Sequence, residues 1–488
     1  MYKSNRILKT VFLTLMIMTS AASDMSVSAA GTLKPDNANN KLLTDVVRID
    51  AGAQSAFAIK ADGSTWAWGG NYGSLGNGSE RPSYTPVQMH IDHVKQISGG
   101  YRHSLIIKDD GTVWAVGGNE HGQLGNGKQS QDLVKEPIQV QDLADMIAVS
   151  AGDDHSLALR KDGTVWAWGG NENGQLGSDP GRNSLKPVRV NGLPSVVAVS
   201  AGQYQSAALG NGGEVWIWGL DKVDDNGRNI VRKPMRLKGT GEYGAISIGR
   251  QYGTALSGNG TVWMWKNEAW PTPALDTLEP FQITGLNDII SISGSAGVKA
   301  DGTVWQWTID ADSGKANVIQ VQGIRDAVAI TEGNRNYYAL LKDGTVLSWG
   351  TNEFGQAGLG VTDFRIETPQ PVRKSIDIYL DGKEIAMATP PLLIQGATYV
   401  PLRGVFENMG ASLSWDTKIR SAIAVKGSVT IVLNTVTGQT TVNGQTVASD
   451  RRPVLVNDSI FVPLRLVSET LGADVKWDDA AYTVRITQ

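Results

Sequence analysis

Cysteine is absent from this sequence of 488 residues, and histidine occurs only five times. Without cysteine no disulfide can form, so packing alone must hold the fold together. After the N-terminal segment, no apolar run approaches the ~20 residues that a membrane-spanning helix needs. The formal net charge is −4, and lysine and arginine are scattered among aspartate and glutamate without a basic stripe. This distribution argues against nucleic-acid binding, which depends on clustered cations.

Glycine and tryptophan, in contrast, are abundant, with 57 and 15 residues. The chain is 41% hydrophobic and 19% charged, so it can bury a sizeable core and should form more than one folded unit. Many tight turns and many large aromatic side chains favour sheets over a helical bundle. The composition therefore predicts a mainly β protein.

The first 30 residues have the order of a secretory signal peptide. Basic residues at positions 3, 6 and 9 precede an apolar run over 11–18, and small residues follow up to Ala30. We expect cleavage after Ala29 or Ala30, then a linker over 31–45. The removed segment carries three positive charges and one negative charge, so the mature chain has a formal charge of about −6. A secreted or cell-surface location follows, with no integral membrane segment after cleavage; a retained N-terminal anchor is the alternative.

An internal repeat dominates the chain from residue 46 to residue 373, and its clearest copy is residues 148–190. A turn glycine recurs at Gly63, Gly111, Gly163, Gly213, Gly260, Gly302 and Gly344, with spacings of 42 to 52 residues. That period is typical of a four-stranded propeller blade, and seven copies predict seven blades. The Asp-Gly or Asn-Gly pairs at these turns predict two-residue hairpins between flanking strands.

A Trp-x-Trp pair follows most of these turns. The pairs are Trp66/Trp68, Trp166/Trp168, Trp216/Trp218, Trp263/Trp265 and Trp305/Trp307, with single tryptophans at Trp114 and Trp349. Alternate positions of a strand share a face, so both indoles of a pair should fill the wedge between neighbouring blades. The alternative is an aromatic platform for sugars. Recurrence of the pair in nearly every blade favours the structural role.

Here the repeat resembles a known family. The strings His-Ser-x-x-Leu, Asp-Gly-Thr-Val-Trp-x-Trp-Gly-x-Asn and Gly-Gln-Leu-Gly are similar to the regulator of chromosome condensation repeat, over about residues 46–373. The resemblance implies a seven-bladed propeller. Blades four to six depart from the pattern, because Gly-Gln-Leu-Gly is missing around 220–234, 266–280 and 308–320, and the sixth copy is shortened after Ser295. We expect those blades to be looser or to carry specialised loops.

A different duplication occupies residues 375–488. The segment 399–403 (Tyr-Val-Pro-Leu-Arg) matches 461–465 (Phe-Val-Pro-Leu-Arg), an offset of 463 − 401 = 62 residues. Each proline should start a helix with apolar residues at helical spacing, closed by Gly410 or Gly472. A strand with Trp415 or Trp477 follows each helix, and further strands are predicted over 422–447. The sequence predicts a small α+β domain.

This duplicated region resembles the copper amine oxidase N-terminal-like domain, which is found in exported proteins of bacteria with thick walls. The resemblance implies a module for attachment to the surface or cell wall. Residues 375–488 contain neither histidine nor cysteine, so we expect no copper site. We expect no cofactor elsewhere in the chain.

The five histidines form no recognisable metal or catalytic arrangement. His103 and His155 occupy the same position of the repeat as Gln205 and Asn336, which favours a structural hydrogen bond. His90 and His93 have a spacing that could hold a metal on a helix, but no third ligand is evident. The Gly-Gly-Asn-x-x-Gly strings open no helix and are read as turns rather than phosphate loops. Acidic turns at 221–227 and 310–314 leave a surface calcium ion possible.

Binding residues are expected at one rim of the propeller, where the two residues after the glycine of the first strand vary between blades. These candidates are Ala53/Gln54, Tyr101/Arg102, Asp153/Asp154, Gln203/Tyr204, Arg250/Gln251 and Asn334/Arg335. Equivalent turns converge around the axis, so they should form a ring suited to protein or glycan contacts. The alternative is that they are solvated turn residues. Trp270 in the fifth blade is a further candidate, with local packing as its alternative.

Three functions remain open. The first is a non-catalytic, exported scaffold whose propeller recognises a protein or an envelope polysaccharide and whose C-terminal domain holds it near the envelope. The second is a glycan-cleaving enzyme that uses a pair of carboxylates. The third, nucleotide exchange on a small GTPase as in the namesake of the repeat, conflicts with the export signal.

Overall fold

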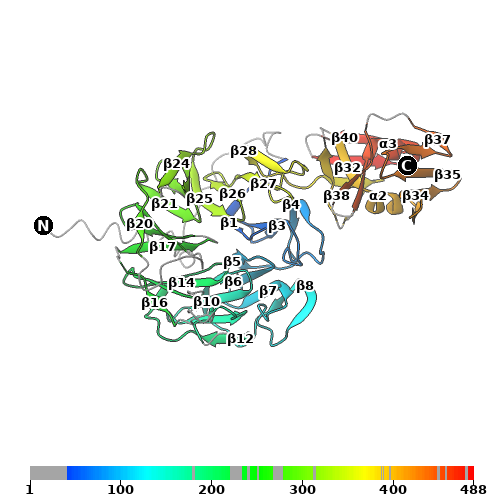
Figure 1. Cartoon of the computed structure of the whole chain (residues 1–488). Coiled ribbons are helices and arrows are strands. Elements are labelled where there is room, and N and C mark those ends of the chain that lie inside the picture. Colours follow the sequence, from blue (N-terminus) through cyan, green and yellow to red (C-terminus); the bar gives the residue numbers. More distant parts are fainter. Residues whose placement is uncertain are drawn as a thin grey trace.

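The computed structural model describes residues 41–488 except 179–181, 220–232, 239–241, 250–251, 267–278, 311–314, 386, 388, 395–396, 448–450, 457–458 and 479–481. The described residues form seven four-stranded sheets arranged around an axis, followed by a smaller α+β domain beside the ring (Figure 1). The predicted fold class, a seven-bladed propeller followed by a small α+β domain, is therefore confirmed.

In each blade the four strands follow one another along the chain, so one repeat builds one blade. The first three blades are β1 (Val46–Ala51) to β4 (Ser83–Gln88) with β2 (Ser55–Lys60) and β3 (Thr65–Gly69); β5 (Val94–Gly99), β6 (His103–Lys108), β7 (Val113–Asn119) and β8 (Ser130–Gln139); and β9 (Met146–Ala151), β10 (His155–Arg160), β11 (Val165–Gly169) and β12 (Ser184–Arg189). The fourth and fifth are β13 (Val196–Ala201), β14 (Gln205–Gly210), β15 (Val215–Gly219) and β16 (Met235–Arg236); and β17 (Tyr243–Ile248), β18 (Tyr252–Ser257), β19 (Val262–Lys266) and β20 (Phe281–Gln282). The last two are β21 (Ile289–Ser293), β22 (Ala296–Lys299), β23 (Val304–Ile309) and β24 (Ala316–Gln320); and β25 (Ala327–Glu332), β26 (Asn336–Leu341), β27 (Val346–Thr351) and β28 (Arg365–Pro371). The first strand of each blade contacts the first strand of the next blade, so these seven strands surround the axis.

The hairpin between the second and third strands differs from the expected two-residue turn. In the first blade the backbone N–H of Lys60 donates to the carbonyl of Ser64 across a longer loop. Gly63 has a φ of 82° there, whereas Asp62 keeps negative φ and accepts hydrogen bonds from the N–H and hydroxyl of Ser64. The same carboxylate contacts recur at Asp110, Asp162 and Asp301. The aspartate therefore caps the turn through its side chain, as short acidic side chains do in turns.

The second tryptophan of each pair packs in the seam between two blades. Trp68, Trp168, Trp218, Trp265 and Trp307 are all no more than 1% exposed. The indole N–H of Trp168 donates to the carbonyl of Gln123 in the preceding blade at 2.8 Å, and Trp218 repeats this contact with Gln175 at 2.9 Å. The first tryptophan of a pair is half-buried at the edge of the same apolar cluster, as Trp166 is beside Trp168. Both indoles of a pair thus belong to one seam.

The ring closes without exchanging a strand between the first and last blades. Instead, residues 41–43 run beside the end of the last blade, where Leu42 forms an antiparallel bridge with Arg373 and the N–H of Leu43 donates to the carbonyl of Val372 at 3.0 Å. Both ends of the propeller sequence therefore hold the closing seam together.

The described residues of the C-terminal domain form three sheets and two short helices. Their elements are β29 (Asp377–Leu380), β30 (Lys383–Glu384), β31 (Leu392–Ile394), β32 (Ala397–Pro401), α2 (Leu402–Asn408), β33 (Ser412–Asp416), β34 (Ser421–Lys426), β35 (Val429–Asn434), β36 (Thr440–Val442), β37 (Gln445–Thr446), β38 (Val454–Val456), β39 (Ser459–Pro463), α3 (Leu464–Thr470), β40 (Asp474–Asp478) and β41 (Thr483–Thr487). Pro401 is the N-cap of α2, and Val405 and Phe406 of that helix are fully buried.

The two copies of the duplication pair with each other at their equivalent strands. β32 and β39 are antiparallel, with Val400 opposite Val462, residues that are 62 positions apart. β29 from the first copy also pairs in parallel with β41 from the second copy. One apolar cluster includes residues of both copies. The duplicated sequence therefore builds one intertwined domain rather than two independent ones.

The C-terminal domain packs against the closing seam of the propeller. Tyr84 on β4 is 6% exposed and lies in an apolar cluster with Leu392, Tyr399 and Phe461 of the C-terminal domain. The N–H of Leu393 donates to the carbonyl of Gly360 in the last blade at 2.7 Å. The first blade and the last blade both contact this domain, so it bridges the seam at which the ring closes.

Candidate functional site at the mouth of the central channel

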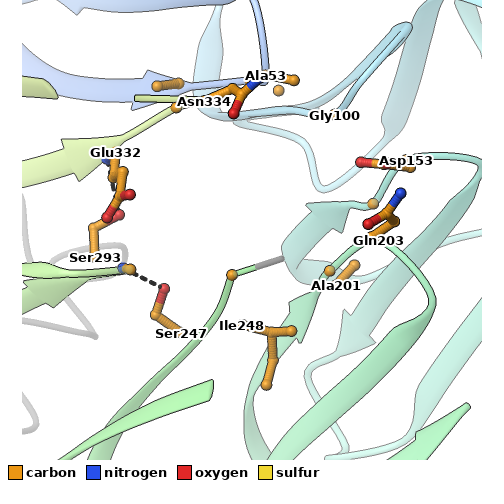
Figure 2. A pocket seen from close by; sticks show the side chains of 18 of the residues that line it. Ala53, Gly100, Asp153, Ala201, Gln203, Ser247, Ile248, Ser293, Glu332 and Asn334 are labelled. Carbon is orange, nitrogen blue, oxygen red and sulfur yellow. Dashed lines mark hydrogen bonds between the residues drawn. The ribbon is translucent and has the colours of Figure 1, made fainter. Parts of the chain in front are cut away.

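A cavity of about 470 Å³ lies where the first strands of the blades end, at the centre of the ring. Its wall consists mainly of glycine and alanine, with a few polar side chains between them. Figure 2 shows Glu332 and Ser293 on one side of this cavity, and Asp153 and Gln203 on the other. A cavity into which a few polar groups converge is a candidate binding site.

Backbone hydrogen bonds join the turns of neighbouring blades around this cavity. The N–H of Ala53 donates to the carbonyl of Gly100 at 3.0 Å, and the N–H of Tyr101 donates to the carbonyl of Gly152 at 3.2 Å. Asn334 closes the series, because its N–H donates to the carbonyl of Ala53 in the first blade at 3.2 Å. The cavity wall is thus built from turns that hold one another in place.

The glycines that follow the first strands, such as Gly100 and Gly152, are required by this close approach. A Cβ on Gly152 would lie 2.5 Å from the carbonyl oxygen of Gly202, and one on Gly100 would lie 2.3 Å from the carbonyl oxygen of Gly152. Both obstacles are backbone atoms of the next blade, which cannot rotate away. Glycine therefore recurs after the first strand because neighbouring blades contact each other there.

A second ring of hydrogen bonds lies just behind the turns. In five blades a serine hydroxyl accepts from a backbone N–H of the next blade, in the pairs Ser98 with Ala151, Ser150 with Ala201, Ser200 with Ile248, Ser247 with Gly294 and Ser293 with Glu332, at 2.9 to 3.2 Å. Asp50 replaces the serine in the first blade and accepts from Gly99 at 2.9 Å. Burial raises the pKa of Asp50 to about 7, although hydrogen bonds from Gly99 and Ala51 favour its charged form.

Glu332 is the exception on the cavity wall. The equivalent residues are Ala51, Gly99, Ala151, Ala201, Ile248 and Gly294, all uncharged and small or apolar. Its carboxylate accepts hydrogen bonds from the backbone N–H and, at 3.0 Å, the hydroxyl of Ser295 in the shortened sixth blade. Burial raises the pKa of Glu332 to about 7, against these hydrogen bonds. The predicted rim residues follow the glycine at the end of each first strand, whereas Glu332 precedes that glycine and was not among them. Alignment of the seven repeats shows a charged residue at this position only in the seventh blade, but only the structure shows that the position faces the cavity.

The predicted rim residues divide into two groups. Asp153, Gln203, Asn334 and Arg335 line the cavity. Tyr101, Arg102, Asp154 and Tyr204 do not line it, and Tyr204 is 40% exposed outside it. Arg250, Gln251 and Trp270 lie outside the described residues, as do the acidic turns at 221–227 and 311–314.

Arg102 organises the outer rim between the first two blades. Its guanidinium lies 5.2 Å from the ring centroid of Tyr72 and 5.9 Å from that of Tyr101, and it pairs with Glu120 at 2.9 Å. Asp154 lies nearby, 3.9 Å from His121. Burial raises the pKa of Asp154, whereas His121 and Arg102 act to lower it. This outer rim is a preorganised aromatic and charged surface.

The histidines of the repeat lie in the seams, away from the cavity wall. His103 and His155 are no more than 1% exposed, and burial lowers the pKa of each to about 3. His90 contacts Glu136 at 3.0 Å, whereas His93 lies 4.0 Å from Asp109, so the two histidines face different carboxylates. In the described part of the chain, no three histidine, aspartate or glutamate side chains are grouped as metal ligands would be.

Among the same residues, no helix has the length and apolar character needed to cross a membrane.

Family models match two regions of the chain. The regulator of chromosome condensation (RCC1) repeat matches residues 62–107, 110–159 and 162–209, and a second model of that repeat matches 94–123, 146–175 and 327–356. These segments lie in the first four blades and the seventh. The copper amine oxidase N-terminal domain matches residues 379–486.

Curated relatives are similar over part of the propeller only. The ultraviolet-B receptor UVR8 of Arabidopsis thaliana is 28% identical over 138 residues, which cover 27% of this chain and 31% of the receptor. The probable E3 ubiquitin-protein ligase HERC6 of Homo sapiens is 37% identical over 157 residues, which cover 31% of this chain and 15% of the ligase. The matches thus span less than a third of either relative.

Solved propellers resemble the chain at low sequence identity. Human WBSCR16 has a TM-score of 0.45 and 22% identity, covering 68% of this chain and 82% of that one. Prp20p of Saccharomyces cerevisiae has a TM-score of 0.43 and 21% identity, covering 67% and 76%. The chain therefore combines a seven-bladed propeller, five of whose blades contain segments that match the regulator of chromosome condensation repeat, with a C-terminal region that matches the copper amine oxidase N-terminal domain.

Proposed function

We propose that this protein is an exported, non-catalytic binding protein, whose propeller recognises a protein or polysaccharide at the mouth of its central channel. The observation that carries the proposal is the cavity itself. Its backbone is locked by hydrogen bonds between blades, while the side chains that project from the turns differ from blade to blade. A rigid frame with variable side chains suits recognition. The relatives that share its repeat support a binding or regulatory propeller.

The second part of the proposal is that the C-terminal domain associates with the cell envelope. Trp415 and Trp477 occupy equivalent positions in its two copies and are 48% and 40% exposed. Exposed aromatic side chains at repeated positions suit contact with a polymer. The signal-peptide pattern of the first 30 residues supports delivery to that location.

Retention of the mature protein on envelope fractions tests this proposal, followed by crosslinking on intact producing cells and identification of the captured molecule. We expect Ala53→Leu, which places a larger side chain on the cavity wall, to reduce capture at least tenfold without affecting envelope retention. Trp415→Ala with Trp477→Ala should do the reverse. If the unsubstituted protein is not retained on envelope fractions and captures no molecule, the proposal is contradicted.

One observation favours a catalytic alternative. Two carboxyl groups, those of Glu332 and Asp153, line the same cavity, and burial raises the pKa of Glu332 to about 7, which suits a general acid near neutral pH. Turnover of wall or polysaccharide substrates that is lost in Glu332→Gln would establish this alternative instead.

A further inference from the structure

Glu332 places a single glutamate on a wall that is otherwise small and uncharged at that position. The residues at the end of the first strand in the other blades are alanine, glycine or isoleucine. Figure 2 shows the Glu332 side chain beside Ser293 on the cavity wall. The seventh blade therefore breaks the symmetry of the ring by introducing a carboxylate.

The carboxylate is held in a defined position. The hydroxyl of Ser295 donates to Glu332 Oε2 at 3.0 Å, and the backbone N–H of Ser295 donates to the same oxygen. Ser295 also lies 3.2 Å from the hydroxyl of Tyr337, which further supports the charged form of Glu332. Among the described residues, no basic side chain contributes to the pKa of Glu332. A desolvated carboxylate of this kind is completed by a cation.

The rest of the wall fits a slender side chain with an apolar stem. Ala51, Ala151, Ala201, Ile248 and Met264 line the cavity. Lysine and arginine bury their methylene stems along such surfaces while their cationic heads seek polar partners. An anionic ligand would instead meet two carboxylates, those of Glu332 and Asp153; the basic side chain among the lining residues, that of Arg335, is exposed.

We infer that the cavity takes an arginine or lysine side chain of a partner protein, whose cationic head contacts Glu332. This inference rests on the proposed binding function and specifies its ligand. A protein side chain is favoured over an amino sugar because Ile248 and Met264 line the same cavity as the carboxylate and offer apolar contacts to a methylene stem. An amino sugar has no such stem.

The pH dependence of binding follows from the groups that face Glu332. Tyr337 on β26 stays neutral, because burial and the charge of Glu332 raise its pKa to about 12. Asp153 lies across the cavity, Arg335 is exposed at its mouth, and Asp50 on β1 has a pKa of about 7 like Glu332. From pH 6 to pH 8 the ionised fraction of a carboxyl with that pKa rises about tenfold. Affinity for a cation should rise by about the same factor.

Calorimetry with N-acetyl-arginine amide and its neutral isostere N-acetyl-citrulline amide tests the inference on the full mature chain. We expect citrulline amide to bind at least tenfold more weakly, and Glu332→Gln to abolish this difference together with the pH dependence. Asp50→Asn, which keeps an acceptor for the N–H of Gly99, should retain both the difference in affinity between the two amides and the pH dependence. Glu367→Gln on β28, an exposed carboxyl of the same blade, should also leave binding unchanged.

Three results would overturn the inference: equal affinity for arginine and citrulline amides, no binding of either, or preferential binding of a glucosamine disaccharide. If Glu332→Gln does not fold, Ala53→Leu serves instead, because it narrows the cavity with a larger side chain and leaves the carboxylate in place. Unchanged affinity for arginine amide would then also refute the inference. Crosslinking on cells separates this inference from the proposed function. Capture that Ala53→Leu blocks but Glu332→Gln and excess arginine amide do not would leave the function standing and reject the cationic ligand.

Discussion

His155 Nε2 lies 2.9 Å from the hydroxyl oxygen of Ser206, which belongs to the next blade. The hydroxyl of Ser206 in turn donates to the carbonyl of Gln175 at 2.8 Å, so His155 is the donor and carries its proton on Nε2. His103 and Ser156 repeat the same contact one blade earlier, at 2.9 Å. Neutral histidine is therefore part of the seam between blades.

Acid should weaken the propeller through these histidines. Burial lowers the pKa of His103 and His155 to about 3, so between pH 6.5 and 3 the unfolded chain binds protons that the folded chain excludes. As the pH is lowered through this window, the free energy of unfolding should fall by up to about 1.4 kcal/mol per pH unit for each histidine. Asp50 and Glu332 act oppositely between about pH 4 and 7, because their pKa values are raised.

The variant His155→Asn isolates this effect, since Asn336 occupies the equivalent position in the seventh blade. Denaturant titrations at several pH values should show a smaller loss of stability below pH 6.5 in the variant than in the unsubstituted protein. His93→Asn is the control, because His93 is exposed. Parallel pH profiles for His155→Asn and the unsubstituted protein would contradict the prediction.

Gly152→Ala should destabilise the propeller by several kcal/mol. The new Cβ would lie 2.5 Å from the carbonyl oxygen of Gly202, and relief requires the two blades to separate. Gly258→Ala is the matched control, because nothing lies within 4 Å of its Cβ position. Thermal unfolding compares the two variants; equal melting temperatures would show that the blades can adjust.

Ser150→Ala should cost about 1–3 kcal/mol, because the buried N–H of Ala201 loses its acceptor. Ser195→Ala, at an exposed position on the connection to the next blade, should change stability by less than about 0.5 kcal/mol. Hydrogen exchange of the Ala201 amide measures the local effect. Unchanged protection of that amide in Ser150→Ala would show that the serine ring contributes nothing to the seam.

Tyr84→Ala should loosen the C-terminal domain from the propeller. The substitution removes the residue that packs against Leu392, Tyr399 and Phe461, at a cost of about 3–5 kcal/mol if the gap does not close. We expect faster proteolysis near residue 375 and a separate unfolding transition for each domain. Tyr204→Ala, which removes an exposed tyrosine, is the control. Its proteolysis and unfolding should match those of the unsubstituted protein.

The sequence led directly to the blades but misjudged one detail of their turns. Seven turn glycines and the Trp-x-Trp pairs indicated seven repeats, because strand alternation and turn chemistry are local properties. The Asp-Gly pairs were assigned a two-residue turn that is not observed. Asp62 acts through its carboxylate on Ser64, and a side-chain contact of that kind is compatible with more than one loop length.

By itself the sequence determined the number of blades, the face on which each tryptophan lies and the duplication in the C-terminal domain. All three depend on periodicity, which is written in the order of residues. Only the tertiary structure decided that Glu332 stands on the cavity wall and that Tyr84 meets the second domain. Those contacts join residues of different blades or domains. They depend on how the blades and the second domain are placed relative to one another, and no local sequence pattern specifies that placement.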